Sequence, residues 1–250
     1  MKYTNIISEI KNKKARTVSK SEIYDMYLKM YSSSNIRNFD NLIAYLKRIN
    51  IIENISKDKY YVRTKSNYMP IEDKEISKII NSINNEYPDI KFSIYNTNII
   101  NEFTQHYAIN NYIIIEIDKI AIELVINLLK EKYFGKYTVI TQDMFINNEQ
   151  LFLNNEKIIV VKPIVQKAPL MNNIFEKYPT IEKIMVDLYV DKLYIQYQGK
   201  ELEYIYKNIF SKYDINLKKL FSYASIRTDI EKYKKFIKRL NVINDLLCEE

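Results

Sequence analysis

The spacing of apolar residues predicts three amphipathic helices and a hairpin in the first quarter of the chain. Apolar residues recur three and four positions apart over residues 3–11, from residue 19 to about residue 30, and over a third segment that ends near residue 49. The second helix opens at Ser19, and Glu22 stands three residues later, which is the pattern of a capping box. Two β-prone runs at 51–55 and 59–63 are joined by a short polar turn and predict the hairpin. Three helices followed by a hairpin is the element order of a winged helix, a variant of the helix-turn-helix DNA-binding motif.

The third predicted helix has one apolar and one polar side. Its apolar positions are Ile36, Phe39, Leu42, Ile43, Leu46 and Ile49. Its polar side offers arginine, which suits guanine or phosphate, asparagine, which suits adenine, and the small Ala44, which permits close approach. We therefore expect a recognition helix whose DNA contacts are extended by the basic hairpin, although a polar helix face can also be merely solvated. The candidate DNA-binding residues are Ser34, Arg37, Asn38, Asn41, Tyr45 and Arg48 on the helix, and Lys57, Lys59 and Arg63 on the hairpin.

The rest of the chain mixes strand and helix patterns. A polar segment with one proline, 64–73, reads as a linker, so we expect a winged-helix domain over 1–66 and a larger mixed α/β domain over 67–250. Strand patterns and intervening helices favour an α/β sheet core, and the chain is expected to turn helical after Pro169. The expected strands are 90–95, 112–117, 137–140 and 158–161, and the expected helices are 73–86, 118–133, 179–189, 200–213, 216–224 and 227–241. The segment 142–157 is rich in Asn and Glu and is predicted to be a loop or hairpin.

The distribution of charge strengthens the DNA-binding interpretation. Residues 1–66 hold 14 Lys and Arg against 6 Asp and Glu, a net charge of +8, whereas residues 67–250 hold 24 against 25, a net charge of −1. A drift in composition would spread the excess over the whole chain. An N-terminal module that binds a polyanion would concentrate it there.

Several functional classes are excluded by composition. With only Gly135 and Gly199, the chain has neither a P-loop nor a glycine-rich dinucleotide-binding turn. One histidine, His106, and one cysteine, Cys248, cannot form a Cys/His zinc site or an intramolecular disulfide, so we expect no cofactor or metal and a reducing, cytoplasmic location. No apolar run is long enough to span a membrane, and the N-terminus lacks the apolar core of a signal peptide.

Two acidic clusters are the candidates for catalysis. Glu116 to Lys119 follows an apolar strand and is similar to the metal-binding motif of PD-(D/E)xK nucleases, but Lys119 follows Asp118 directly, which is the wrong spacing. We favour the alternative in which Asp118 caps the next helix. The second cluster, Glu182, Lys183, Asp187 and Asp191, follows the period of one helix, and we expect a surface ladder of ion pairs there. Glu182 could serve as a general base, but no partner near it in the sequence completes a site.

Beyond these patterns, the chain resembles the AbiEi-type antitoxins of abortive-infection, or type IV, toxin–antitoxin systems. The resemblance covers most of the chain and is most specific over Pro179 to Leu188. Further matching segments are Tyr68 to Pro70, Phe92 to Thr97, Tyr112 to Lys132, Val161 to Val165 with Ala168-Pro169, Tyr197 to Leu202, and Tyr223-Ala224. The chain departs from the family pattern after Ala224, where Ser225 and Ile226 stand before Arg227 instead of an immediate arginine.

The resemblance implies a non-enzymatic transcriptional repressor with a role in phage defence. Its winged helix would bind inverted repeats in double-stranded DNA at its own promoter, and its C-terminal domain would counter a nucleotidyltransferase toxin encoded next door. Two alternatives stay open. One is a metal-dependent nuclease with a DNA-binding head, which requires Glu116 or Asp118 beside other carboxylates in space. The other is a regulator that senses a small ligand through its C-terminal domain.

Overall fold

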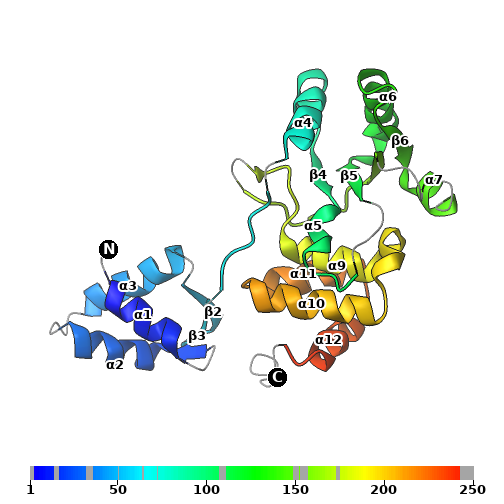
Figure 1. Cartoon of the computed structure of the whole chain (residues 1–250). Helices are drawn as coiled ribbons and strands as arrows, with labels where there is room; N and C mark the ends of the chain where they lie inside the picture. Colours follow the sequence, from blue (N-terminus) through cyan, green and yellow to red (C-terminus); the bar gives the residue numbers. More distant parts are fainter. Residues whose placement is uncertain are drawn as a thin grey trace. The chain divides into compact units, whose positions relative to one another are not determined.

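The protein has a mixed α+β fold, described by a computed structural model (Figure 1). The structure describes residues 3–13, 17–31, 36–49, 51–63, 65–71, 73–106, 111–148, 152, 157–172 and 175–242, with the side chains of Ile36 and Arg37 left out. The described residues form two compact units. Unit 1 comprises the residues up to Asn67 together with Lys212–Asp214, and unit 2 comprises Tyr68–Ser211 and Ile215–Val242.

Unit 1 contains three helices and a three-stranded antiparallel sheet. Its elements are α1 (Thr4–Asn12), β1 (Thr17–Ser19), α2 (Lys20–Met30), α3 (Ile36–Arg48), β2 (Ile52–Ser56) and β3 (Lys59–Val62), with the strand order β1-β3-β2. The predicted capping box is confirmed, since the Ser19 hydroxyl accepts from the Glu22 N–H and the Glu22 carboxylate accepts from the Ser19 N–H. Strand β1 was not predicted, because three residues are too few to display a period.

The helices and the sheet of unit 1 enclose one apolar core. Ile6 and Ile10 of α1, Ile23 of α2, and Leu42 and Leu46 of α3 are completely buried in it. The helical spacing in the sequence predicts that these residues lie on the apolar faces of the three helices. The core therefore fixes which side of α3 faces outward.

Unit 2 is built around a four-stranded sheet with the order β4-β5-β7-β6, in which β4 is antiparallel and the other three strands are mutually parallel. The strands are β4 (Phe92–Asn96), β5 (Tyr112–Ile117), β6 (Thr138–Thr141) and β7 (Ile158–Pro163). The helices are α4 (Lys74–Glu86), α5 (Asn98–Asn101), η1 (Lys119–Ala121), α6 (Ile122–Lys132), α7 (Gln142–Asn147), α9 (Ile181–Val190), η3 (Lys192–Tyr197), α10 (Lys200–Lys212), α11 (Leu217–Arg227) and α12 (Ile230–Arg239). Among the described residues, no helix is long and apolar enough to cross a membrane.

The two faces of this sheet meet different helices. Because side chains alternate along a strand, Ile113, Ile115 and Ile117 of β5 point to one face, where they pack against α4 and α6. Glu116 points to the opposite face, where it contacts Lys183 of α9. The sheet is thus enclosed on both sides, which explains why the whole of β5 is buried.

Two segments of unit 2 test the sequence predictions closely. The Asp118 carboxylate accepts from the N–H of Ile120 at 3.2 Å, so the predicted cap at the end of β5 is confirmed. The prediction of a loop or hairpin over 142–157 is wrong in its first part, which forms α7. Thr141 caps this helix by accepting from the N–H of Met144, a start signal that the Asn-rich composition obscured.

Candidate nucleic-acid interface and a buried charge network

The outer face of α3 carries the candidate DNA-binding residues that the structure describes on this helix. Asn38, Asn41, Ala44 and Arg48 are exposed, whereas Phe39, Leu42, Ile43 and Leu46 are buried on the inner side. Tyr45 is half-buried, and the Arg48 guanidinium lies 5.4 Å from the centre of its ring. The position of Arg37 in α3 is described, but its side chain and the whole of Ser34 lie outside the described residues.

The hairpin residues differ in how they are engaged. Lys57 is exposed in the turn between β2 and β3, and Lys59 is half-buried at the start of β3. Arg63 donates to the Glu53 carboxylate at 2.5 Å and to the Asn67 side chain at 3.4 Å. Arg63 therefore supports the base of the hairpin, whereas Lys57 has the more open position.

Unit 2 contains a second polar feature, a network of charged side chains between its sheet and α9, which we call the buried charge network. The strand register creates the first half of it. Glu116 is directly opposite Ser93 on the antiparallel strand β4 and beside Lys162 on the parallel strand β7. The three side chains therefore form a row across the sheet, on the face that meets α9.

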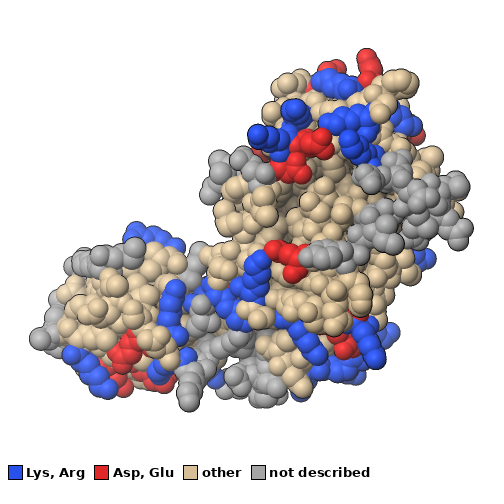
Figure 2. Space-filling view, viewed as in Figure 1, with Lys and Arg blue, Asp and Glu red and all other residues tan. Residues whose placement is uncertain are grey.

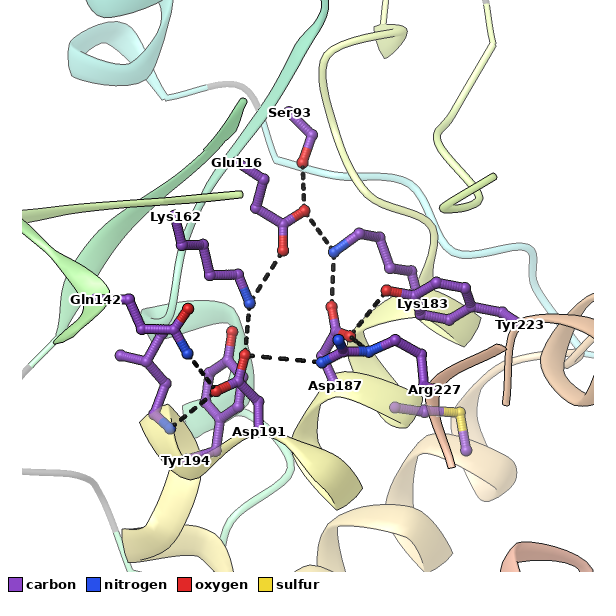
Figure 3. A network of polar contacts seen from close by, with 12 residues as sticks. Ser93, Glu116, Gln142, Lys162, Lys183, Asp187, Asp191, Tyr194, Tyr223 and Arg227 are labelled. Atoms are coloured by element: carbon purple, nitrogen blue, oxygen red, sulfur yellow. Dashed lines mark hydrogen bonds and ion pairs between the residues drawn. The ribbon is translucent and has the colours of Figure 1, made fainter. Parts of the chain in front are cut away.

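Helix α9 supplies the other half (Figure 3). The Glu116 carboxylate lies 3.1 Å from Lys162 Nζ through Oε1 and 2.5 Å from Lys183 Nζ through Oε2. Lys183 Nζ also lies 2.6 Å from Asp187 Oδ2, and Lys162 Nζ lies 2.7 Å from Asp191 Oδ2. Because Lys183, Asp187 and Asp191 are spaced four residues apart, they share one face of α9.

Side chains from further elements also contact the two aspartates, through hydrogen bonds and an ion pair. Asp187 accepts from the Tyr223 hydroxyl at 2.9 Å, and its Oδ1 lies 3.3 Å from Arg227 Nε. Asp191 accepts from the Gln142 side chain at 2.8 Å. Arg227 is the most exposed of the six charged groups, with 21% of its side chain accessible, so the network approaches solvent at α11.

The charges of the network balance. Three carboxylates face two ammonium groups and one guanidinium, and the side chains of Glu116 and Lys183 are at most 1% exposed. Burial raises the pKa of Glu116, but the adjacent Lys183 and Lys162 outweigh burial and hold that pKa at about 2. Glu116 is therefore an ionised acceptor at neutral pH and has no proton to give. The arrangement joins β5, β7, α9 and α11, which is a structural role that needs no substrate.

The prediction of a surface ion-pair ladder on α9 is wrong. Lys183 and Asp187 do pair four residues apart, but both are buried against the sheet. Glu182 is also buried, and its carboxylate accepts from the N–H of Asn216 at 3.0 Å, just before α11. A signal was present in the sequence, since Glu116 and Lys162 interrupt two apolar strands with opposite charges, and buried charges occur in pairs.

The nuclease alternative required carboxylates gathered around Glu116 or Asp118. In the structure the charged neighbours of Glu116 are lysines, and Asp118 caps η1. Within the described part of the chain, no group of three or more His, Cys, Asp or Glu side chains is placed to hold a metal ion. His106 is 86% exposed, and its Nδ1 lies 3.4 Å from the Glu201 carboxylate, away from the buried charge network.

Comparison with known proteins gives a family and no described activity. No curated protein matches the sequence. The pattern of a protein family of unknown function, DUF6577, matches residues 38–243, which include most of α3, the hairpin and the whole buried charge network. The chain therefore belongs to the DUF6577 family.

Proposed function

We propose that the protein is a DNA-binding transcriptional regulator whose unit 1 is a winged helix with α3 as its recognition helix. The observation that carries the proposal is the outer face of α3, where Asn38, Asn41 and Arg48 are exposed along one side of a helix whose other side is buried. Side chains of this kind on a projecting helix can reach base edges in the major groove.

Two further features of unit 1 support the proposal. Strand β1 joins the hairpin to form a three-stranded sheet, so the elements follow the order helix, strand, helix, helix, hairpin. The exposed Lys57 at the hairpin turn and the net charge of +8 over residues 1–66 favour a phosphate backbone as the partner. Arg63 contributes indirectly by holding Glu53.

For unit 2 we propose the antitoxin role that the resemblance to AbiEi-type proteins implies. The protein would repress its own operon and counter a nucleotidyltransferase toxin. The most specific segment of that resemblance, Pro179 to Leu188, contains most of α9 and with it Lys183 and Asp187 of the buried charge network. This part of the motif is explained by packing, so contacts with a toxin would be made by other residues.

The experiment uses the full chain and a duplex that covers the region upstream of its gene. We expect a gel shift that weakens steeply with salt, because phosphate contacts release counterions. Arg37→Ala combined with Arg48→Ala is expected to abolish the shift without changing the circular dichroism spectrum. Lys29→Ala with Lys11→Ala is the matched control, because it removes the same charge from exposed positions on α2 and α1.

An unchanged shift in the Arg37→Ala/Arg48→Ala variant would reject α3 as the recognition helix. Cleavage of the duplex by the wild type in Mg²⁺ or Mn²⁺ would favour the nuclease instead. The antitoxin role is tested separately by co-expression with a nucleotidyltransferase encoded next to the gene. The double variant should still restore growth if unit 2 acts on the toxin independently of DNA binding.

A further inference from the structure

Helix α12 is the most basic element of unit 2, and its charges lie on one side. Its ten residues include five Lys and Arg and one Glu. On its inner side, Tyr233 and Ile237 of the helix and Leu240 at its C-terminal end are buried. A second stripe, at the spacing i, i+3, i+4, i+7, faces outward and consists of Lys232, Lys235, Phe236 and Arg239.

This outward stripe forms one wall of an open groove of about 510 Å³. The other wall consists of Tyr189 from α9 with Gly199, Leu202 and Glu203 at the start of α10. The rings of the lining residues Tyr189 and Phe236 lie 5.0 Å apart, and both residues are half-buried. The groove thus combines two partly accessible aromatic side chains with cationic ones. Its volume lies within the range of roughly 300–1,000 Å³ that small ligands occupy.

The cations at the edges are only partly neutralised. Arg239 donates to Glu203 at 2.7 Å but keeps 68% of its side chain exposed, and Lys232 keeps 78% while lying 3.7 Å from Asp229. Among the residues that the structure describes, Lys235 has no carboxylate within ion-pair distance. Basic side chains, with some acidic ones among them, are visible where α12 lies in Figure 1 (Figure 2).

The near-neutral total of residues 67–250 conceals this groove. Helix α12 carries five Lys and Arg against one Glu, and acidic residues elsewhere in the same range offset this excess in the total. The partner of the groove is anionic because the cations of its edges exceed its one acid, Glu203. A membrane surface does not fit, because the apolar side of α12 is buried in unit 2 and is not free to enter lipid.

We infer that this groove binds a nucleotide with an unpaired base, as part of a single nucleic-acid strand. The base stacks on Phe236 and Tyr189, and the flanking phosphates contact Lys232, Lys235 and Arg239. Stacking on an aromatic base flanked by cations is how proteins hold single strands without reading their sequence. In a duplex the bases are stacked on one another and their faces are not available to the two rings. The groove therefore takes a different ligand from the duplex proposed for α3.

The test measures fluorescence anisotropy of a labelled 12-nucleotide oligo(U) with the full chain carrying Arg37→Ala and Arg48→Ala, so that the α3 face does not contribute. We expect Lys232→Gln combined with Lys235→Gln to weaken binding at least tenfold. Phe236→Leu should weaken it about fivefold or more, because stacking on an aromatic side chain is lost. Lys218→Gln combined with Lys219→Gln is the matched control, since it removes the same charge from exposed positions on α11.

Equal weakening by the two lysine double variants would overturn the proposal, because it would show only general attraction to a basic surface. Unchanged affinity in Lys232→Gln/Lys235→Gln would overturn it as well. Competition by ATP shows whether the groove binds a free nucleotide or a nucleotide within a nucleic-acid strand. Displacement of the oligonucleotide by micromolar ATP would contradict the proposal that the groove binds a strand. Displacement only by unlabelled oligonucleotide would support it.

Discussion

At the scale of single residues, the burial of the Glu116 carboxylate depends on its charged partners. Its carboxylate is buried in the middle of β5 and is acceptable there because Lys162 and Lys183 both contact it. Glu116→Gln removes the charge but keeps the shape, and it leaves two buried ammonium groups short of a partner. We expect the free energy of unfolding to fall by about 3–5 kcal/mol, the usual cost of breaking a buried ion pair from one side. Urea unfolding of the full chain, followed by circular dichroism at pH 7, measures the change.

The matched control is Glu131→Gln on α6, where the same chemical change is made at an exposed position. It should alter the urea midpoint little, since exposed charges away from special features contribute little to stability. Equal midpoints for the two variants would show that the buried charge network does not stabilise the fold as its geometry indicates.

The same residue predicts how stability depends on pH. Burial would raise the pKa of Glu116, but Lys183 and Lys162 lower it from 4.5 to about 2. The folded state therefore binds fewer protons than the unfolded state between these values, and the stability from Glu116 is complete above about pH 4.5 and is lost as the pH falls towards 2. In Glu116→Gln this contribution is absent, so its free energy of unfolding should fall less steeply between pH 5 and pH 3.

Carboxylates outside the buried charge network do not interfere with that comparison. The pKa of Glu22 is also lowered to about 2, by hydrogen bonds from Lys13 and from the Ser19 N–H, but this group is unchanged in the variant. The difference between wild type and Glu116→Gln therefore reports on Glu116 together with the charged groups that it contacts. Parallel pH profiles for the two proteins would mean that Glu116 has a similar pKa in the folded and unfolded states.

At the scale of elements, the hairpin between β2 and β3 offers a prediction about DNA. Lys57 is exposed in its turn, so Lys57→Ala should leave the fold intact. If Lys57 contacts a phosphate, its loss weakens binding to every duplex by a similar factor and lowers the slope of log affinity against log salt by about 1. Titrations of the upstream duplex at four salt concentrations would reveal this. A variant with the wild-type slope would place Lys57 away from the backbone.

The elements also show what the sequence can reveal about this fold. Helix α3 was predicted from its period, because it is long enough to display it and packs one face on the core. The hairpin was predicted from two β-prone runs and the polar turn between them. Strand β1 is held by pairing with β3, a partner about forty residues away in the sequence, so its three residues carry no signal of their own. The i, i+4 pairing of Lys183 and Asp187 was also predictable, but not its burial. That burial depends on the register of β4, β5 and β7, which places Glu116 opposite α9.

At the scale of the whole molecule, charge is sorted into three environments that the total of +7 does not distinguish. Unit 1 carries the excess over residues 1–66, the buried charge network is balanced, and α12 presents a basic stripe on a unit that is otherwise near neutral. The sequence revealed only the first of these. The second requires the strand register, which brings Glu116 and Lys162 together against α9, and the third is offset in the total by acidic residues elsewhere in 67–250. For the two proposed nucleic-acid contacts, one on each unit, we expect that substitutions in one leave the other unchanged.

Unit 1 includes a short segment from much later in the sequence. Besides the residues up to Asn67, this unit includes Lys212–Asp214, and Asp214 is buried with its carboxylate 2.8 Å from the Lys65 N–H and 3.5 Å from the Tyr61 hydroxyl. Asp214→Ala leaves these donors without that acceptor, which should cost about 1–3 kcal/mol. The loss should appear as faster amide hydrogen exchange in peptides from 17–63, with α9 unchanged, whereas Asp214→Asn, which retains one acceptor oxygen, should show a smaller effect. Equal acceleration in both units would instead indicate that Asp214 stabilises the whole chain.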